Sequence, residues 1–305
     1  LIGNMSGNAI IGADYQTVTA QLKQARGTYT GTYDLDNWDG SAFAKPDVDY
    51  TASGSTQTKT DLTRYGVYSQ LRLQPVDAVN VILGGRLTWY DLDTENSLTG
   101  ATTAEVSEDG KFTPYAGFTY DVTPFATLYA SYTSIFQPQT ETASDGSALK
   151  PREGHQAEVG LKAELFDQVN AAIGYFDLTD KNRAVTDPIT SETTAGEDVR
   201  ARGVELQLSG EITEGWQVFG GYTFTETLYE DGNDATEGAT FSTYTPDHMV
   251  QLRTSYTFGS GLLENFSIGG GARWCSDFYA ETSTGIGIRA DSYTVVDLSA
   301  GYQVN

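Results

Sequence analysis

The sequence predicts an all-β fold, an antiparallel up-and-down β-barrel that crosses a membrane, and three observations lead to it. Apolar and polar residues alternate through most of the chain, whereas helical periodicity is hard to find. Most of the alternating segments have about ten or more residues, the length that a tilted membrane-spanning strand needs. Short and long connections also alternate, so all the long loops emerge at one end, as in membrane barrels.

The segment VNVILGGRLTWYDLD, residues 79–93, illustrates the alternation. Its odd positions are mainly apolar, and its even positions are mainly polar and include Arg86 and Tyr90. A soluble β-sandwich would pack the apolar face against a second sheet. A membrane barrel would turn that face to lipid and line its lumen with the polar face. Strand length, loop asymmetry and the aromatic residues near strand ends favour the barrel.

About twelve strands are expected. In chain order they cover residues 7–22, 58–73, 79–94, 111–121, 125–137, 154–165, 169–181, 199–212, 216–229, 246–258, 265–280 and 291–304. The expected long loops are 23–57, 95–110, 138–153, 182–198, 230–245 and 281–290. The expected lipid-facing residues include Val81, Leu83, Leu87, Leu206, Leu208, Val250, Leu252, Ile268 and Ala272.

The amino-acid composition excludes several classes of protein. The chain has 305 residues, 33 of them glycine, and 12% are aromatic, which is typical of a β protein with many turns. The 41 acidic and 18 basic residues give a net charge of -23, which argues against nucleic acid as a partner. There is no apolar run of about 18 residues, so a bundle of transmembrane helices is excluded. The single cysteine, Cys275, excludes a disulfide framework within the chain.

Enzymatic motifs are missing from the sequence. His155 and His248 are far apart, and neither has the spacing of a zinc ligand. No phosphate-binding loop, nucleophile elbow or dinucleotide-binding fingerprint is present. We therefore expect no catalytic residues, no bound metal and no cofactor.

Five stretches in a fixed order resemble the barrel of TonB-dependent ferric-siderophore receptors of the Gram-negative outer membrane. They lie at 113–140, 149–167, 201–227, 269–274 and 293–305, and include TPYAGFTYDVTPFATLYASYTSIFQPQT and ARGVELQLSGEITEGWQVFGGYTFTET. The resemblance extends from about residue 58 onward and is greatest to the hydroxamate branch, which takes up coprogen and pyoverdine-like ligands.

The resemblance implies a cell outer-membrane location and a ferric siderophore as the transported ligand. It also implies outer-membrane lipid around the barrel and the TonB–ExbB–ExbD complex as energy source, contacted through an N-terminal part that these residues do not include. The family barrel has about 22 strands and a plugged lumen. We therefore expect residues 1–305 to be one partial barrel domain without the plug. The alternatives are a receptor for another nutrient (cobalamin or a glycan), a passive porin and a soluble β-sandwich binding module.

A ligand should bind at the loop end of the lumen, where aromatic surface and hydrogen-bond donors can surround a chelate. Tyr90, Tyr229 and Tyr279 are expected at strand ends on the polar face, and Trp38 and Tyr244 in long loops. Each could instead serve loop packing. Polar-face charges such as Arg86, Arg253, Glu158, Glu205 and Asp297 could bind ligand or form a network that holds a plug. Arg64, nearer the loops than Arg72, is the cation chosen as a candidate ligand contact.

Overall fold

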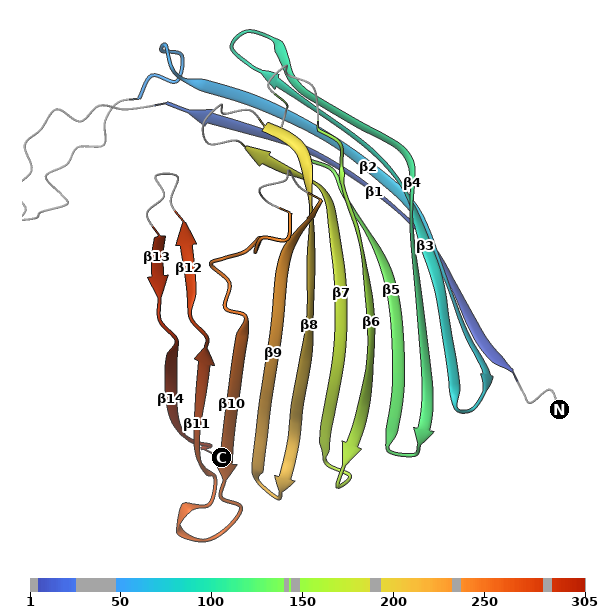
Figure 1. Ribbon diagram of the computed structural model, residues 1–305, viewed down its shortest axis with the longest axis vertical. Helices are drawn as coiled ribbons and strands as arrows, with labels where there is room; N and C mark the ends of the chain where they lie inside the picture. Colours follow the sequence, from blue (N-terminus) through green and yellow to red (C-terminus); the bar gives the residue numbers. More distant parts are fainter. Residues whose placement is uncertain are drawn as a thin grey trace, which may run out of the picture.

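A single curved sheet of twelve antiparallel strands forms the body of the protein (Figure 1). The computed structural model describes residues 5–25, 48–139, 143, 149–186, 193–231, 237–281 and 287–304. Within the sheet, each strand pairs with its neighbour in sequence, except that β11 pairs with β14. The predicted all-β, up-and-down arrangement is confirmed.

The strands of the sheet are β1 (Ser6–Gln24), β2 (Thr56–Val76), β3 (Val79–Asn96), β4 (Ala101–Thr123), β5 (Ala126–Gln137), β6 (Arg152–Leu165), β7 (Val169–Thr186), β8 (Thr193–Thr213), β9 (Trp216–Asp231), β10 (His248–Thr257), β11 (Phe266–Cys275) and β14 (Tyr293–Tyr302). A separate two-stranded hairpin contains β12 (Phe278–Glu281) and β13 (Gly287–Ala290), and a short 3-10 helix, η2, covers Gly261–Leu263. No helix in the described ranges is long and apolar enough to cross a membrane.

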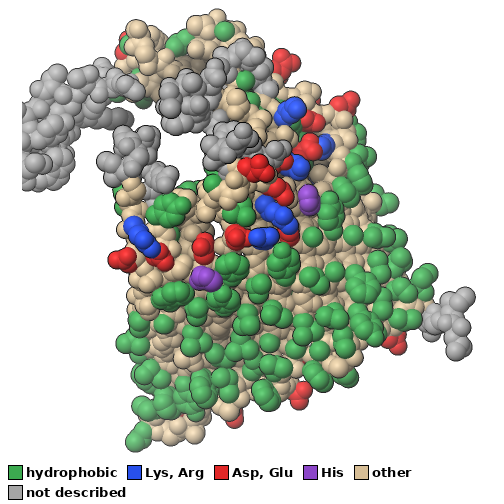
Figure 2. Space-filling view, viewed as in Figure 1, with side chains coloured by type: hydrophobic (Ala, Val, Ile, Leu, Met, Phe, Trp, Pro, Cys, Tyr) green, Lys and Arg blue, Asp and Glu red, His purple; other side chains and the backbone are tan. Residues whose placement is uncertain are grey.

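The register gives the sheet one apolar and one polar face. Leu83 lies opposite Leu71 and Ala116, so apolar side chains run in rows across neighbouring strands. Leu206 and Leu252 on this face are 45% and 52% exposed in the isolated sheet. Figure 2 shows one face of the molecule, with hydrophobic side chains over the lower parts of the strands and charged side chains in a band above them. This is the pattern of a wall that meets lipid below and water above.

Most connections alternate as predicted, but β3 and β4 are joined by residues 97–100 alone, whereas the β10–β11 connection at the turn end covers residues 258–265. The β6–β7 turn contains Phe166 and Asp167, both with positive φ (54° and 59°), as in the tight hairpin turns that match strand twist. The β8–β9 turn uses Gly215, with φ 79°. Figure 1 shows these short turns at one end of the sheet and the longer connections at the other.

Several expected boundaries are wrong. The predicted loop 182–198 is strand at both ends, because β7 continues to Thr186 and β8 begins at Thr193. The predicted loop 95–110 is largely strand, because β3 continues to Asn96 and β4 begins at Ala101. The predicted strand 265–280 is interrupted, because β11 ends at Cys275 and residues 278–281 pair with β13 instead of β14. Tyr279 therefore lies on the separate hairpin. The alternation along β11 does not extend to it, so it does not place Tyr279 on the polar face.

On the polar face, several aromatic rings lie over a glycine of the neighbouring strand. A Cβ atom added at each of these glycines would come within 2.3 to 2.8 Å of ring atoms of its partner. The directly opposed pairs are Tyr68 with Gly12, Tyr115 with Gly84, Tyr129 with Gly160, and Phe176 with Gly203. The glycines are required here because the rings occupy the space of a side chain.

Candidate functional site

A cavity of about 320 Å³ lies toward the loop end of the polar face, where β4 and β5 separate. The ladder between these strands ends at Tyr115 and Thr133, although both strands continue toward the loops. The residues that line the cavity come from both sides of this gap: Arg64, Arg86, Thr88, Tyr90, Thr113, Ser134, Ile135, Phe136 and Pro138.

Two predicted site residues, Arg64 and Tyr90, meet in this cavity. They lie directly opposite each other on β2 and β3. The Nη2 of Arg64 donates to Oε1 of Gln16 at 2.8 Å. Tyr90 is only 8% exposed, since it packs with the buried Leu92 and Val106. The structure thus brings a cation and an aromatic ring together.

The second arginine of the cavity, Arg86, is paired within the protein. Its Nη1 and Nη2 donate to the two carboxylate oxygens of Asp14 at 2.5 and 3.0 Å, and its Nε donates to Oγ1 of Thr88 at 2.9 Å. The guanidinium crosses β2 over Gly66, where an added Cβ would lie 2.3 Å from Nη2. Arg86 therefore belongs to the polar-face network that the sequence suggested, with its charge balanced by Asp14.

Side chains bridge the gap above the end of the β4–β5 ladder. Ser134 donates from Oγ to the carbonyl oxygen of Pro114 at 2.9 Å. Lys111 forms an ion pair with Glu153, and its Nζ lies 5.9 Å from the centroid of the Phe136 ring. These contacts hold the two sides of the cavity together where backbone hydrogen bonds are missing.

The other predicted site residues lie elsewhere. Tyr229 is on β9, six places from β3 in the sheet order, and its ring meets Phe241 edge-on at 5.3 Å. Tyr279 on β12 and Tyr244 are 42% and 63% exposed. Trp38 lies outside the described residues. The five candidates among the described residues therefore do not form one cluster, and the contact of all six with a ligand stays a prediction.

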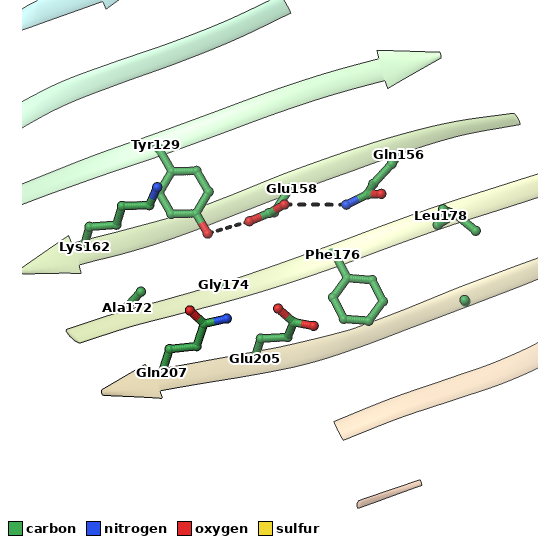
Figure 3. Close-up of a pocket in the computed structure, with 11 residues that line it drawn as sticks. Tyr129, Gln156, Glu158, Lys162, Ala172, Gly174, Phe176, Leu178, Glu205 and Gln207 are labelled. Atoms are coloured by element: carbon green, nitrogen blue, oxygen red, sulfur yellow. Dashed lines mark hydrogen bonds between the residues drawn. The ribbon is translucent and has the colours of Figure 1, made fainter. Parts of the chain in front are cut away.

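A second hollow of about 440 Å³ lies on the polar face over β5 to β8 (Figure 3). The hydroxyl of Tyr129 donates to Oε1 of Glu158 at 2.5 Å, and Nζ of Lys162 lies 4.8 Å from the centroid of the Tyr129 ring. Figure 3 shows Glu205 on the opposite side of the hollow from Glu158, with Gly174 between them. The alternation of polar and apolar residues placed both glutamates on this face, but Tyr129 and Lys162 were not named there. Both occupy alternate positions that face the same side as the glutamates, so the same alternation could have identified them.

The two histidines pack against aromatic rings, and the cysteine is buried. His248 lies 5.0 Å from the Phe224 ring, and His155 stacks on Tyr132 at 5.9 Å between ring centroids. Cys275 is buried, on the polar side of β11 as its parity predicted. Within the described ranges, no three His, Cys, Asp or Glu side chains lie close enough together to hold a metal ion.

A twelve-stranded antiparallel sheet with one apolar face, short turns at one end and a cavity near the long connections defines a wall of a membrane β-barrel. The family model described as "TonB dependent receptor-like, beta-barrel" matches residues 2–305. The chain belongs to this family and is part of a barrel of the Gram-negative outer membrane. Its apolar face meets lipid, and its polar face is the lumen face.

Particular relatives agree with this assignment. The chain is 34% identical over 290 residues to the ferripyoverdine receptor of Pseudomonas aeruginosa, covering 90% of this chain and 33% of the relative. It is 32% identical over 265 residues to the ferrichrome outer membrane transporter/phage receptor of Escherichia coli K12, covering 85% and 34%. Among solved structures, the pyoverdine outer membrane receptor FpvA from Pseudomonas aeruginosa PAO1 bound to pyoverdine matches with a TM-score of 0.79 and 32% identity, over 97% of this chain and 44% of that one.

The chain thus spans about a third of the length of the curated relatives it matches. These relatives are receptors and transporters rather than enzymes.

Proposed function

We propose that this chain forms part of the barrel of a receptor that binds a ferric siderophore and imports it by TonB-coupled transport. The observation that carries the proposal is the cavity near the loop end of the lumen face, which joins the guanidinium of Arg64 to the rings of Tyr90 and Phe136. A ferric chelate already has a full set of iron ligands. The receptor therefore needs only aromatic surface and a few donors, which this cavity offers.

In this proposal the protein does no bond chemistry. Iron enters as cargo within its chelate, and the receptor carries no cofactor of its own. Energy comes from the TonB–ExbB–ExbD complex, which contacts the receptor outside the residues described above. The names of the relatives, which refer to ferripyoverdine and ferrichrome, support a siderophore as the cargo.

The test is uptake of a radiolabelled ferric siderophore by iron-starved cells that express the full-length receptor containing this chain. Cells without the receptor and cells without TonB are the two comparisons. We expect uptake only when both proteins are present. Uptake that does not depend on TonB would instead identify a passive porin. Binding of cobalamin or a glycan, with no binding of any ferric chelate, would identify a receptor for another nutrient.

A further inference from the structure

From the cavity between β4 and β5 we infer that Arg64 makes this receptor selective for ferric chelates that carry a negative charge. The inference rests on the proposed function and adds the charge class of the ligand. It starts from an imbalance of charge: two arginines line the cavity, and none of the nine lining residues in the described part of the chain is an aspartate or glutamate.

The two arginines differ in their partners. Arg86 is neutralised by Asp14, which it contacts with both terminal nitrogens. Arg64 donates only to the neutral amide of Gln16, and no carboxylate in the described part of the chain forms an ion pair with it. A guanidinium has several N–H donors in a planar fork, so most of those on Arg64 remain for an anionic oxygen.

The sheet register explains why Asp14 does not serve Arg64. Asp14 lies opposite Gly66, and the missing side chain at this position opens the path by which Arg86 reaches the carboxylate. Arg64 is opposite Gln16 on one side and Tyr90 on the other. Because of this local pairing, Arg64 has no ion pair with a described carboxylate, and most of its N–H donors stay available to a ligand in the cavity.

The shape of the cavity identifies which part of a ligand it takes. A volume of about 320 Å³ is at the lower end of the range for small-molecule sites, so it suits one arm of a bulky chelate. Tyr90, Ile135 and Phe136 supply aromatic and apolar walls, and Thr88 on the same wall is almost fully buried. A flat anionic group, such as an iron-bound catecholate ring, would place its ring on these walls and its charge toward Arg64.

The experiment measures binding of two probes to the purified full-length receptor in detergent. One is the trianionic ferric complex of a tris-catecholate, and the other is the neutral ferric complex of a tris-hydroxamate. The variant is Arg64→Gln, and Arg72→Gln is the matched control, since Arg72 is on the same strand and face nearer the turn end. Arg64→Lys keeps the positive charge but loses the planar, forked guanidinium. It serves as the second variant if Arg64→Gln does not assemble.

We expect the wild type to prefer the anionic probe, and Arg64→Gln to weaken that binding by about tenfold or more, as for other charge-assisted hydrogen bonds. Binding of the neutral probe should change little, and Arg64→Lys should lose less than Arg64→Gln. Added salt should weaken only the anionic probe. A wild type that prefers the neutral probe, or an equal effect of Arg64→Gln and Arg72→Gln, would overturn the inference while leaving the proposed function intact. If the wild type binds neither probe, the proposed function fails and this inference fails with it.

Discussion

Arg86 on β3 donates two hydrogen bonds to the carboxylate of Asp14 on β1, across the full width of the strand between them. The contact joins β1 to β3 by side chains, in addition to the backbone ladder that each of them forms with β2. It is possible only because position 66 on β2 has no side chain, since a Cβ there would lie 2.3 Å from Arg86 Nη2 and 2.9 Å from the carbonyl oxygen of Leu87.

Gly66→Ala should therefore break this contact. We expect the variant to lose about 1–3 kcal/mol of stability, the usual cost of an extra methyl group in a filled space. The control is Gly117→Ala, where the nearest atom to an added Cβ is Ile82 Cβ at 3.7 Å. The measurement is the temperature at which the folded full-length barrel loses its heat-modifiable migration on a gel. Equal transition temperatures for the two variants would contradict the prediction.

The two faces of β8 should respond differently to a charge. Leu206 is on the apolar face between Ile173 and Tyr222, whereas Gln207 lines the hollow on the polar face. An arginine on the lipid side near mid-membrane costs about 2–4 kcal/mol. Leu206→Arg should therefore reduce assembly into the outer membrane much more than Gln207→Arg. Similar amounts of folded barrel from the two variants would mean that the assigned faces are wrong.

Removing the hydroxyl of Tyr129 tests its hydrogen bond to Glu158. Tyr129→Phe keeps the ring over Gly160 but leaves the carboxylate without this donor, which we expect to cost about 1.5 kcal/mol. Tyr68→Phe is the matched control, because Tyr68 also lies over a glycine and its hydroxyl has no hydrogen bond to the described residues. Denaturant unfolding of the full-length barrel should separate the two variants, and no difference between them would show that the hydrogen bond adds nothing.

The β12–β13 hairpin should loosen in acid. Arg289 donates to Asp277 at 2.6 Å, and this hydrogen bond lowers the pKa of the Asp277 carboxyl. A carboxyl whose pKa is lowered by folding stabilises the structure above its unfolded pKa of about 3.9, and this contribution is lost as the pH falls through the lowered value.

Hydrogen exchange of the hairpin amides, corrected for intrinsic rates, should accordingly rise below about pH 4. In Asp277→Asn it should already be faster at neutral pH and change less in acid. The amides paired between β10 and β11 serve as the internal reference. A hairpin with the same acid response in both proteins would rule out this ion pair as the cause.

Alternation along the strands was enough to predict both faces, because a shift of one residue would turn every side chain to the other side. It failed at 95–110, where several acidic residues suggested a loop. There Leu92 and Val106 are directly opposed, and they pack beside Tyr90, so a buried apolar cluster extends the hairpin. The break after Cys275 could not be predicted from the alternation either, because it depends on the pairing of β11 with β14, which stops at Cys275 and Tyr293.

The candidate site was predicted only in part for the same reason. The alternation along each strand placed Arg64 and Tyr90 on the same face, and the register between β2 and β3 makes them direct neighbours. Ile135 and Phe136 join them because β4 and β5 separate above Tyr115, which is a relation between distant segments. Pro114, a residue uncommon inside strands, is next to the last pair of that ladder and was the one local signal of the separation.

The rings that lie over Gly12, Gly84, Gly160 and Gly203 also determine how far the wall protrudes into the lumen. A tyrosine or phenylalanine that stood upright from the sheet would extend by the length of its side chain toward the barrel axis. Because each neighbouring glycine gives its ring room to lie along the backbone, the wall gains aromatic surface while adding little more than the thickness of a ring. The lumen face therefore carries aromatic surface that stands little higher than the backbone, and the space beside the sheet stays open despite the number of rings.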